Sequence, residues 1–197
     1  MLAFVIFVFA VAGMIKGTIG LGLPAVSMGL LSLVISPFQA ATLLIIPSMV
    51  TNFWQLFAEG RVLRLVQRFW PLLVGMIIGS VWSVFPTLGH GEFQSEALLG
   101  GMLAIYGLYG LFAKNMPNLA PYEKYLSPIM GYLGGALTVA TGVVVIPVVP
   151  YLQSLHLKRD DLVQSLGLAF TVSTLCLAVY LHLNPVEDTP IDYQLSL

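Results

Sequence analysis

The feature that most constrains this chain is where its charged residues lie. No Asp, Glu, Lys or Arg occurs from residue 2 to residue 15, and after Lys16 the next charged residue is Glu59. Apolar residues make up 58% of the sequence and charged residues 9%, with a mean hydropathy of +0.92. A soluble domain carries roughly a quarter charged residues. The composition therefore excludes a cytosolic enzyme, a secreted domain and a nucleic-acid-binding domain, and it predicts that the chain lies in a lipid bilayer.

Proline, glycine and short polar stretches divide the apolar length into segments that we interpret as helices. The predicted segments are residues 2–15, 21–35, 40–57, 69–88, 97–113, 128–141, 142–153 and 162–183. One crossing of the membrane takes about 20 residues, so the first two segments, and likewise the sixth and seventh, are each short for a crossing. Two short helices that meet inside the membrane fit both lengths. We therefore expect an all-α polytopic membrane protein with two broken, re-entrant helical hairpins.

The charged loops predict an orientation. Residues 59–68 carry three arginines and should be cytoplasmic, because cytoplasmic loops are enriched in Lys and Arg. That places residues 89–96 outside and 114–127 inside, and it places the N-terminus outside if residues 2–35 form a hairpin. The first residues also lack the positive start of a cleaved signal peptide. We expect a multi-pass protein of the cell inner membrane.

The sequence contains a weak internal repeat. Residues 13–24 read GMIKGTIGLGLP, and residues 131–147 again begin with two glycines four apart. The first unit holds a hairpin and three crossings, an odd number, so the second unit should begin on the opposite side. This is the inverted-repeat arrangement of secondary transporters, whose broken segments end near the bilayer midplane. The alternative is an old duplication that survives as scaffold, without a site at the breaks.

The repeat divides the chain into four regions. They are a first transmembrane repeat at 1–113, a cytoplasmic linker at 114–127, a partial second repeat at 128–183 and a polar tail at 184–197. After its hairpin the first repeat has three long segments, whereas the second has one. We therefore expect a truncated second repeat, completed by another chain or in a homo-oligomer. The alternative is a naturally shorter protein whose tail caps the bundle.

Lys16 is the one charged residue that lies within an apolar run. A buried ammonium group costs several kcal/mol unless it is paired, so an intramembrane lysine indicates a functional site. Lys16 precedes a break at Gly17, Gly20 and Gly22, where glycine leaves backbone N–H groups unshielded and a new helix would direct its positive end. This combination predicts a site for a small anion. The alternative is snorkelling, in which the side chain carries its charge to the headgroups.

Four other polar residues are candidates for the same site. Asn52 and Gln55 lie three residues apart on one helix face, and their amides can donate hydrogen bonds to an anion without adding a second charge. They could equally hold two helices together. Thr138 and Thr141 occupy the second break, where their hydroxyl groups either bind a ligand or bond back to their own helix.

Several chemistries have no residues to carry them. No Asp or Glu falls within a predicted segment, so the carboxylate relay of proton-coupled carriers is absent there. The single cysteine, Cys176, excludes a disulfide framework and a cysteine-based zinc site, and the three histidines lack the spacing of a metal site. No Ser–His arrangement or aspartate pair lies at membrane depth. We expect neither an enzyme nor a bound metal or cofactor.

These motifs resemble a known family. Residues 16–24 (KGTIGLGLP), the Ser36-Pro37 break and residues 47–55 are similar to the first repeat of the TauE/SafE sulfite exporters, also called toluene-sulfonate uptake permeases. Residues 131–147 resemble the family's second glycine-rich repeat, with Ala140-Thr141-Gly142-Val143 in place of the usual run of glycines. The resemblance implies an inner-membrane permease that moves sulfite, sulfonates or related anions outward. It also implies two inverted repeats around a central site.

The residues themselves leave three functional classes open. The first is a secondary carrier for a small anion. The second is a membrane scaffold or accessory subunit that transports nothing, and the third is an anion channel that uses the same electropositive break without alternating access. A carrier saturates and shows counterflow, a channel gives unitary currents, and a scaffold does neither.

Overall fold

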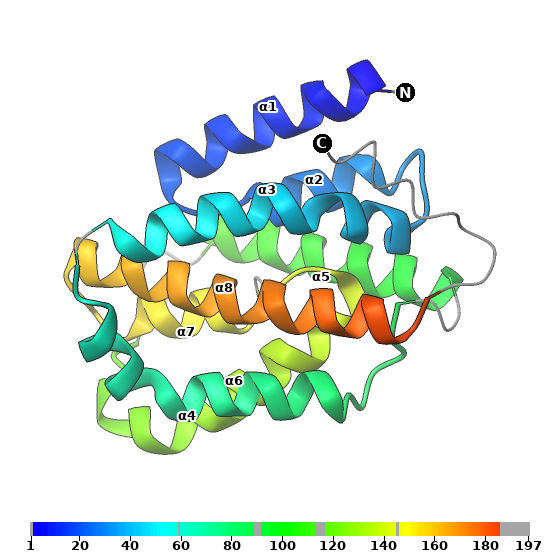
Figure 1. Ribbon diagram of the computed structural model, residues 1–197. Helices are drawn as coiled ribbons and strands as arrows, with labels where there is room; N and C mark the ends of the chain where they lie inside the picture. Colours follow the sequence, from blue (N-terminus) through cyan, green and yellow to red (C-terminus); the bar gives the residue numbers. More distant parts are fainter. Residues whose placement is uncertain (1, 59, 89–91, 113–116, 145, 186–197) are drawn as a thin grey trace.

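A computed structural model describes residues 2–58, 60–88, 92–112, 117–144 and 146–185, which form helices joined by short connections (Figure 1). The α-helices are α1 (Leu2–Ile19), α2 (Leu23–Leu31), α3 (Pro37–Phe57), α4 (Val62–Val81), α5 (Glu92–Phe112), α6 (Glu123–Thr141), α7 (Val148–Ser154) and α8 (Arg159–Leu183). A short 3-10 helix, Ala120–Tyr122, precedes α6. Most of the predicted tail 184–197, and residues 89–91 and 114–116 of the predicted loops, lie outside the described residues.

Five of these helices are long and apolar enough to cross a membrane. They are α1, α3, α4, residues 95–112 of α5, and α8. Large apolar side chains also cover the outside of the bundle; Trp54, for example, is 83% exposed. An exposed apolar surface of this extent suits lipid and not water. The prediction of an all-α polytopic membrane protein is confirmed.

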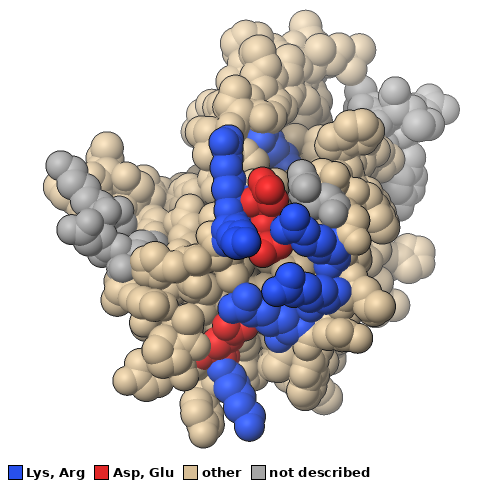
Figure 2. All heavy atoms as spheres, turned by 90° about the vertical axis from the view of Figure 1, so that its left-hand side faces the viewer, with Lys and Arg blue, Asp and Glu red and all other residues tan. Residues whose placement is uncertain are grey.

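Charged side chains gather at one end of the bundle, the left-hand end in Figure 1 (Figure 2). There Arg61 forms an ion pair with Asp161 at 2.8 Å, and Arg68 forms a two-point pair with Glu123 at 2.7 and 2.8 Å. These pairs join the starts of α4, α6 and α8. We refer to this as the charged end.

The predicted boundaries of α4 and α6 were wrong. The segment predicted at 69–88 is the helix Val62–Val81, so most of the predicted loop 59–68 is helical. Arginine does not end a helix when its guanidinium can pair, as that of Arg68 does with Glu123. After Val81 the backbone leaves helical geometry at Trp82, whose φ and ψ are −115° and 65°. Likewise α6 begins at Glu123, where a carboxylate favours the positive end of the helix, and not at 128.

Two pairs of glycines bring α4 and α6 into close contact. A Cβ atom on Gly79 would overlap the carbonyl oxygen of Tyr132, and one on Gly135 would overlap that of Met76. At Gly75 and Gly131, too, backbone atoms of the opposite helix occupy the space that a Cβ atom would need. Small residues four apart permit such an approach because no side chain separates the two backbones. The α4–α6 seam is therefore a backbone-to-backbone interface.

Contacts across the bundle fix the direction of each helix. Leu72 meets Gly131 and Met76 meets Gly135, so α4 and α6 are parallel. Lys16 meets Asn52, and Gly20 meets Gln55, so α1 and α3 are parallel as well. Because α3 and α4 follow one another across the short connection at the charged end, they run in opposite directions, and so do α1 and α6 (Figure 1). Helix α8 is antiparallel to α3, since Asn52 meets Thr174 and Leu56 meets Gln164.

Both helix breaks differ in extent from the prediction. Helix α1 continues through Lys16 and Gly17 to Ile19, and the break lies at Gly20 and Gly22, with φ of 80° and 106°. One glycine in a helix costs only about 1 kcal/mol, which is too little to end α1 at residue 15. The segment predicted at 142–153 is helical only over α7, because Gly142 ends α6 with a φ of 74°. The truncation of the second repeat, the four-region division and the completing chain stay predictions.

Candidate functional site

Lys16 points into the protein. It shares one face of α1 with Val5, Val8 and Ala12, at the three- and four-residue spacing of a buried helix face, and it is 6% exposed. Its Nζ donates to Thr51 Oγ1 at 2.9 Å and to Asn52 Oδ1, and it lies 5.7 Å from the centre of the Phe170 ring. Among the described residues no carboxylate forms an ion pair with Lys16. Neutral acceptors and an aromatic face therefore hold this ammonium group inside the bundle.

Asn52 connects Lys16 to α8. Its side chain is fully buried in α3; Oδ1 accepts from the Lys16 ammonium, and Nδ2 donates to Thr174 Oγ1 at 3.1 Å. The amide therefore uses its acceptor for α1 and its donor for α8. One side chain joins three helices at the position of the buried charge.

Gln55 holds the first helix break in place. Its Nε2 donates to the Gly20 carbonyl oxygen at 2.9 Å and to the Val163 carbonyl oxygen at 2.8 Å. Gly20 lies in the break after α1, whereas Val163 lies in the second turn of α8, so this one side chain ties the break to α8. Its Oε1 is buried without a hydrogen-bond partner among the described residues.

The structure brings together some of the predicted site residues and not others. Lys16 bonds to Asn52 and Gly20 to Gln55, and the Gly20 N–H donates to the Lys16 carbonyl at 2.7 Å, so these four residues form one connected cluster. Gly17 lies within α1, is exposed, and has open space where a Cβ would stand, so it does not line this cluster. Gly22 is the residue before α2 and adopts the left-handed conformation that glycine favours.

The two threonines of the second break bond to their own helix. Thr138 Oγ1 donates to the Gly134 carbonyl at 2.7 Å and also meets Ser173 Oγ at 3.0 Å. Thr141 Oγ1 donates to the Leu137 carbonyl at 2.8 Å. This is the back-bonding that hydroxyl side chains adopt in apolar helices. In this conformation the two threonine hydroxyls already have acceptors.

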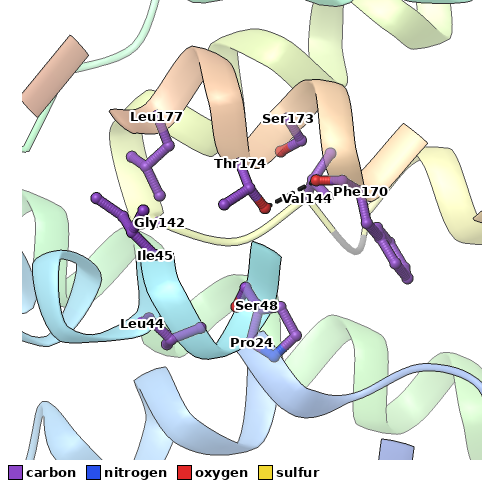
Figure 3. Close-up of a pocket in the computed structure, with 10 residues that line it drawn as sticks. All are labelled: Pro24, Leu44, Ile45, Ser48, Gly142, Val144, Phe170, Ser173, Thr174 and Leu177. Carbon is purple, nitrogen blue, oxygen red and sulfur yellow. Dashed lines mark hydrogen bonds between the residues drawn. The ribbon is translucent and has the colours of Figure 1, made fainter. Parts of the chain in front are cut away.

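A small cavity lies between α3, α8, the start of α2 and the second break (Figure 3). Its volume is about 20 Å³, room for a single water molecule. Its walls are formed by Pro24, Leu44, Ile45, Ser48, Gly142, Val144, Phe170, Ser173, Thr174 and Leu177. Figure 3 shows Ser48 on one side, with Ser173 and Thr174 on the other. Thr174 also bonds to Asn52, so the cavity borders the Lys16 cluster.

Sequence reasoning missed the three hydroxyl residues of this cavity. Ser48 lies one helical turn before Asn52, so the spacing of 48, 52 and 55 on one face of α3 was available as a signal. Ser173 and Thr174 gave no comparable signal, because hydroxyl residues in apolar helices commonly bond only to their own backbone.

Fold and site together define a polytopic membrane protein with a buried ammonium group beside a helix break, to which no carboxylate of the described residues pairs. The sequence matches the family described as Sulfite exporter TauE/SafE over residues 5–195, and the chain belongs to this family. No curated protein and no solved structure matches the chain. The family confirms the resemblance seen in the sequence and identifies the chain as a membrane protein of a transporter family.

Proposed function

We propose that this chain is a secondary transporter of the cell inner membrane that moves small organosulfur anions, such as sulfite or sulfonates, outward. Membership of the sulfite exporter family supports transport as the activity. The observation that carries the proposal is the buried ammonium group of Lys16, which is held by neutral acceptors.

The chemistry of this ammonium favours an anion as its ligand. A lysine has three N–H donors, and two of them reach Thr51 and Asn52. Neither acceptor carries the negative charge that would offset removal of the ammonium from water. A sulfite or sulfonate oxygen would supply that charge in a charge-assisted hydrogen bond. Lys16 is therefore the group proposed to bind the substrate, with Asn52 and Gln55 positioning it and the break at Gly20.

The helix arrangement supports a carrier over a channel. Helices α1 and α6 each lead into a break and run in opposite directions, as two inverted repeats would place them. The cavity that borders the Lys16 cluster has room for only one water molecule, so the described conformation offers no continuous space for an anion to pass there. Transport then requires alternation between conformations, which is the property of a carrier.

The proposed orientation places the charged end in the cytoplasm. Arg61, Arg64 and Arg68 lie there, whereas the start of α1 lies at the opposite end (Figure 1). In a Cys176→Ala background, Leu2→Cys should react with an impermeant thiol reagent added outside cells, and Arg64→Cys should not. The reverse pattern would overturn the orientation.

A flux screen in proteoliposomes tests the function. We expect saturable uptake and counterflow of sulfite, thiosulfate or short sulfonates, and weaker flux of short carboxylates, which have a different shape and one oxygen fewer than a sulfonate. Unitary currents without saturation would identify a channel instead. The absence of any flux from folded protein would identify a scaffold.

A further inference from the structure

Ser48 has a buried hydroxyl group that the described protein leaves without a partner. It lies in the middle of α3, is 1% exposed, and its Oγ makes no hydrogen bond among the described residues. It also lines the cavity between α3 and α8 (Figure 3). A buried hydroxyl is normally hydrogen-bonded, and leaving one unbonded is costly. The hydroxyl group of Ser48 therefore needs a partner inside the cavity.

The opposite wall limits what that partner can be. Thr174 Oγ1 donates to the Phe170 carbonyl at 2.8 Å and accepts from Asn52, while Ser173 Oγ shares a hydrogen bond with Thr138. These two hydroxyls are already engaged, so Ser48 is the wall residue with a proton to donate. A donor facing a space of about 20 Å³ matches one oxygen atom that accepts a hydrogen bond.

The charge beside the cavity selects an anion over a cation. The amide of Asn52 touches the Lys16 ammonium with one end and Thr174, a cavity wall residue, with the other. Phe170 likewise faces Lys16 with its ring and lines the cavity. A positive charge one side chain away disfavours a metal ion at Ser48 and favours an oxygen with negative charge.

We propose that the cavity at Ser48, Ser173 and Thr174 is a second binding point for the transported anion. The cavity binds one oxygen of the anion, while the Lys16 ammonium group pairs with its negative charge. This rests on the proposed function and deepens it. An anion with oxygens on several sides, as in sulfite and the sulfonates, can meet both points. A single-atom anion such as chloride cannot, so the cavity is a specificity site for oxyanions.

The test compares two buried serines that both lack a partner. Ser48→Ala removes the cavity hydroxyl, whereas Ser27→Ala removes a hydroxyl in α2 that is equally buried but does not line the cavity. We expect Ser48→Ala to raise the KM for sulfite flux roughly tenfold, as loss of a hydrogen bond to a charged group implies, and Ser27→Ala to leave it unchanged. Ser48→Thr, which keeps the hydroxyl, should restore most of the affinity, and Ser48→Cys, whose thiol is a weak donor, should raise KM less than Ser48→Ala does.

The outcomes separate the two proposals. If the wild-type chain shows no saturable flux of any organosulfur anion, the proposed function fails and this inference fails with it. If Lys16→Gln raises KM but Ser48→Ala behaves like Ser27→Ala, the cavity holds water only and the inference is overturned while the function stands. A variant counts only when it elutes as a single species with the melting temperature of the wild type; if Ser48→Ala fails this, Ser48→Cys decides alone.

Discussion

Helices α1 and α6 carry the same motif and use it differently. Each has two glycines four residues apart, and each is followed by a break with a glycine in the left-handed conformation, Gly20 and Gly22 after α1 and Gly142 after α6. In α6, Gly131 and Gly135 meet the backbone of α4 so closely that no Cβ would fit. In α1, Gly13 and Gly17 face open space. The spacing therefore permits close packing but does not determine it. Helix α6 packs closely because α4 supplies a second pair of glycines, Gly75 and Gly79, opposite its own.

The breaks that follow α1 and α6 also differ in what holds them. The break after α6 has threonines whose hydroxyls bond to their own helix. The break after α1 follows a buried charge and is held by the side chain of Gln55 from α3. The second unit therefore contributes packing and one wall of the cavity, whereas the first contributes the charge.

Filling the α4–α6 seam should have the largest effect on stability. In Gly135→Ala the new methyl group overlaps the Met76 carbonyl, so the two backbones must separate. We expect a loss of about 3 kcal/mol, from the strain of overpacking. Unfolding in detergent micelles, followed by circular dichroism against denaturant concentration, measures it. A wild-type unfolding curve for Gly135→Ala would show that the seam can relax freely.

Removing the side chain that holds the first break should have the next largest effect on stability. Gln55→Met keeps the length of the side chain but leaves the Gly20 and Val163 carbonyls without its two hydrogen bonds. We expect a loss of about 2 kcal/mol, at about 1 kcal/mol for each bond. Gln164→Met is the matched control, since Gln164 Nε2 donates a single bond, to the Leu56 carbonyl. Equal losses of stability in the two variants would contradict the view that Gln55 contributes two hydrogen bonds.

Breaking the ion pair at the start of the α4–α6 seam should reduce the stability by a smaller amount. The pair joins Arg68, in the second turn of α4, to Glu123, the first residue of α6, and the Arg68 side chain is about 40% exposed. For Arg68→Gln we expect a loss of about 1 kcal/mol or less, which shrinks as salt concentration rises because the pair is screened. Unfolding curves at low and high salt measure both effects. A salt-independent loss would show that packing, and not charge, is what the arginine contributes.

The smallest effect should come from the open glycine of α1. Gly17→Ala places a methyl group where no atom lies within 4 Å, and alanine is the better helix former. We expect stability to be unchanged or to rise by up to about 1 kcal/mol. The same unfolding assay, run beside Gly135→Ala, measures the contrast directly. A loss comparable to that of Gly135→Ala would mean that α1 is already packed at Gly17.

Much of this architecture follows from the sequence, for identifiable reasons. Charge-free runs and the glycines at positions 20 and 142 predicted the long helices and both breaks, because few other structures fit such residues in lipid. The start of α4 was misplaced because Arg68 pairs with Glu123, which is 55 residues away in the sequence. The difference between Gly17 and Gly135 is also invisible in the sequence, because it depends on what lies opposite each glycine.

Part of the candidate site could likewise be predicted from the sequence, and part could not. Lys16, Asn52 and Gln55 were found because a charge or an amide in an apolar helix is unusual enough to need a reason. Ser48 was missed because a serine is common in such helices, and only the position of α8 makes its unpaired hydroxyl significant. The chemistry of the residues was enough to identify the buried charge, whereas the cavity beside it could be identified only from the fold.

Anion flux in a Lys16 variant tests the central claim most directly. Wild-type protein and Lys16→Gln are reconstituted at equal density, and initial rates of sulfite counterflow are measured over a range of concentrations. Glutamine keeps hydrogen bonding to Asn52 possible but removes the charge, so we predict a KM raised roughly tenfold or more, with Ser27→Ala unchanged beside it. If folded Lys16→Gln transports sulfite with the wild-type KM, the buried ammonium is not the anion site and the account is wrong.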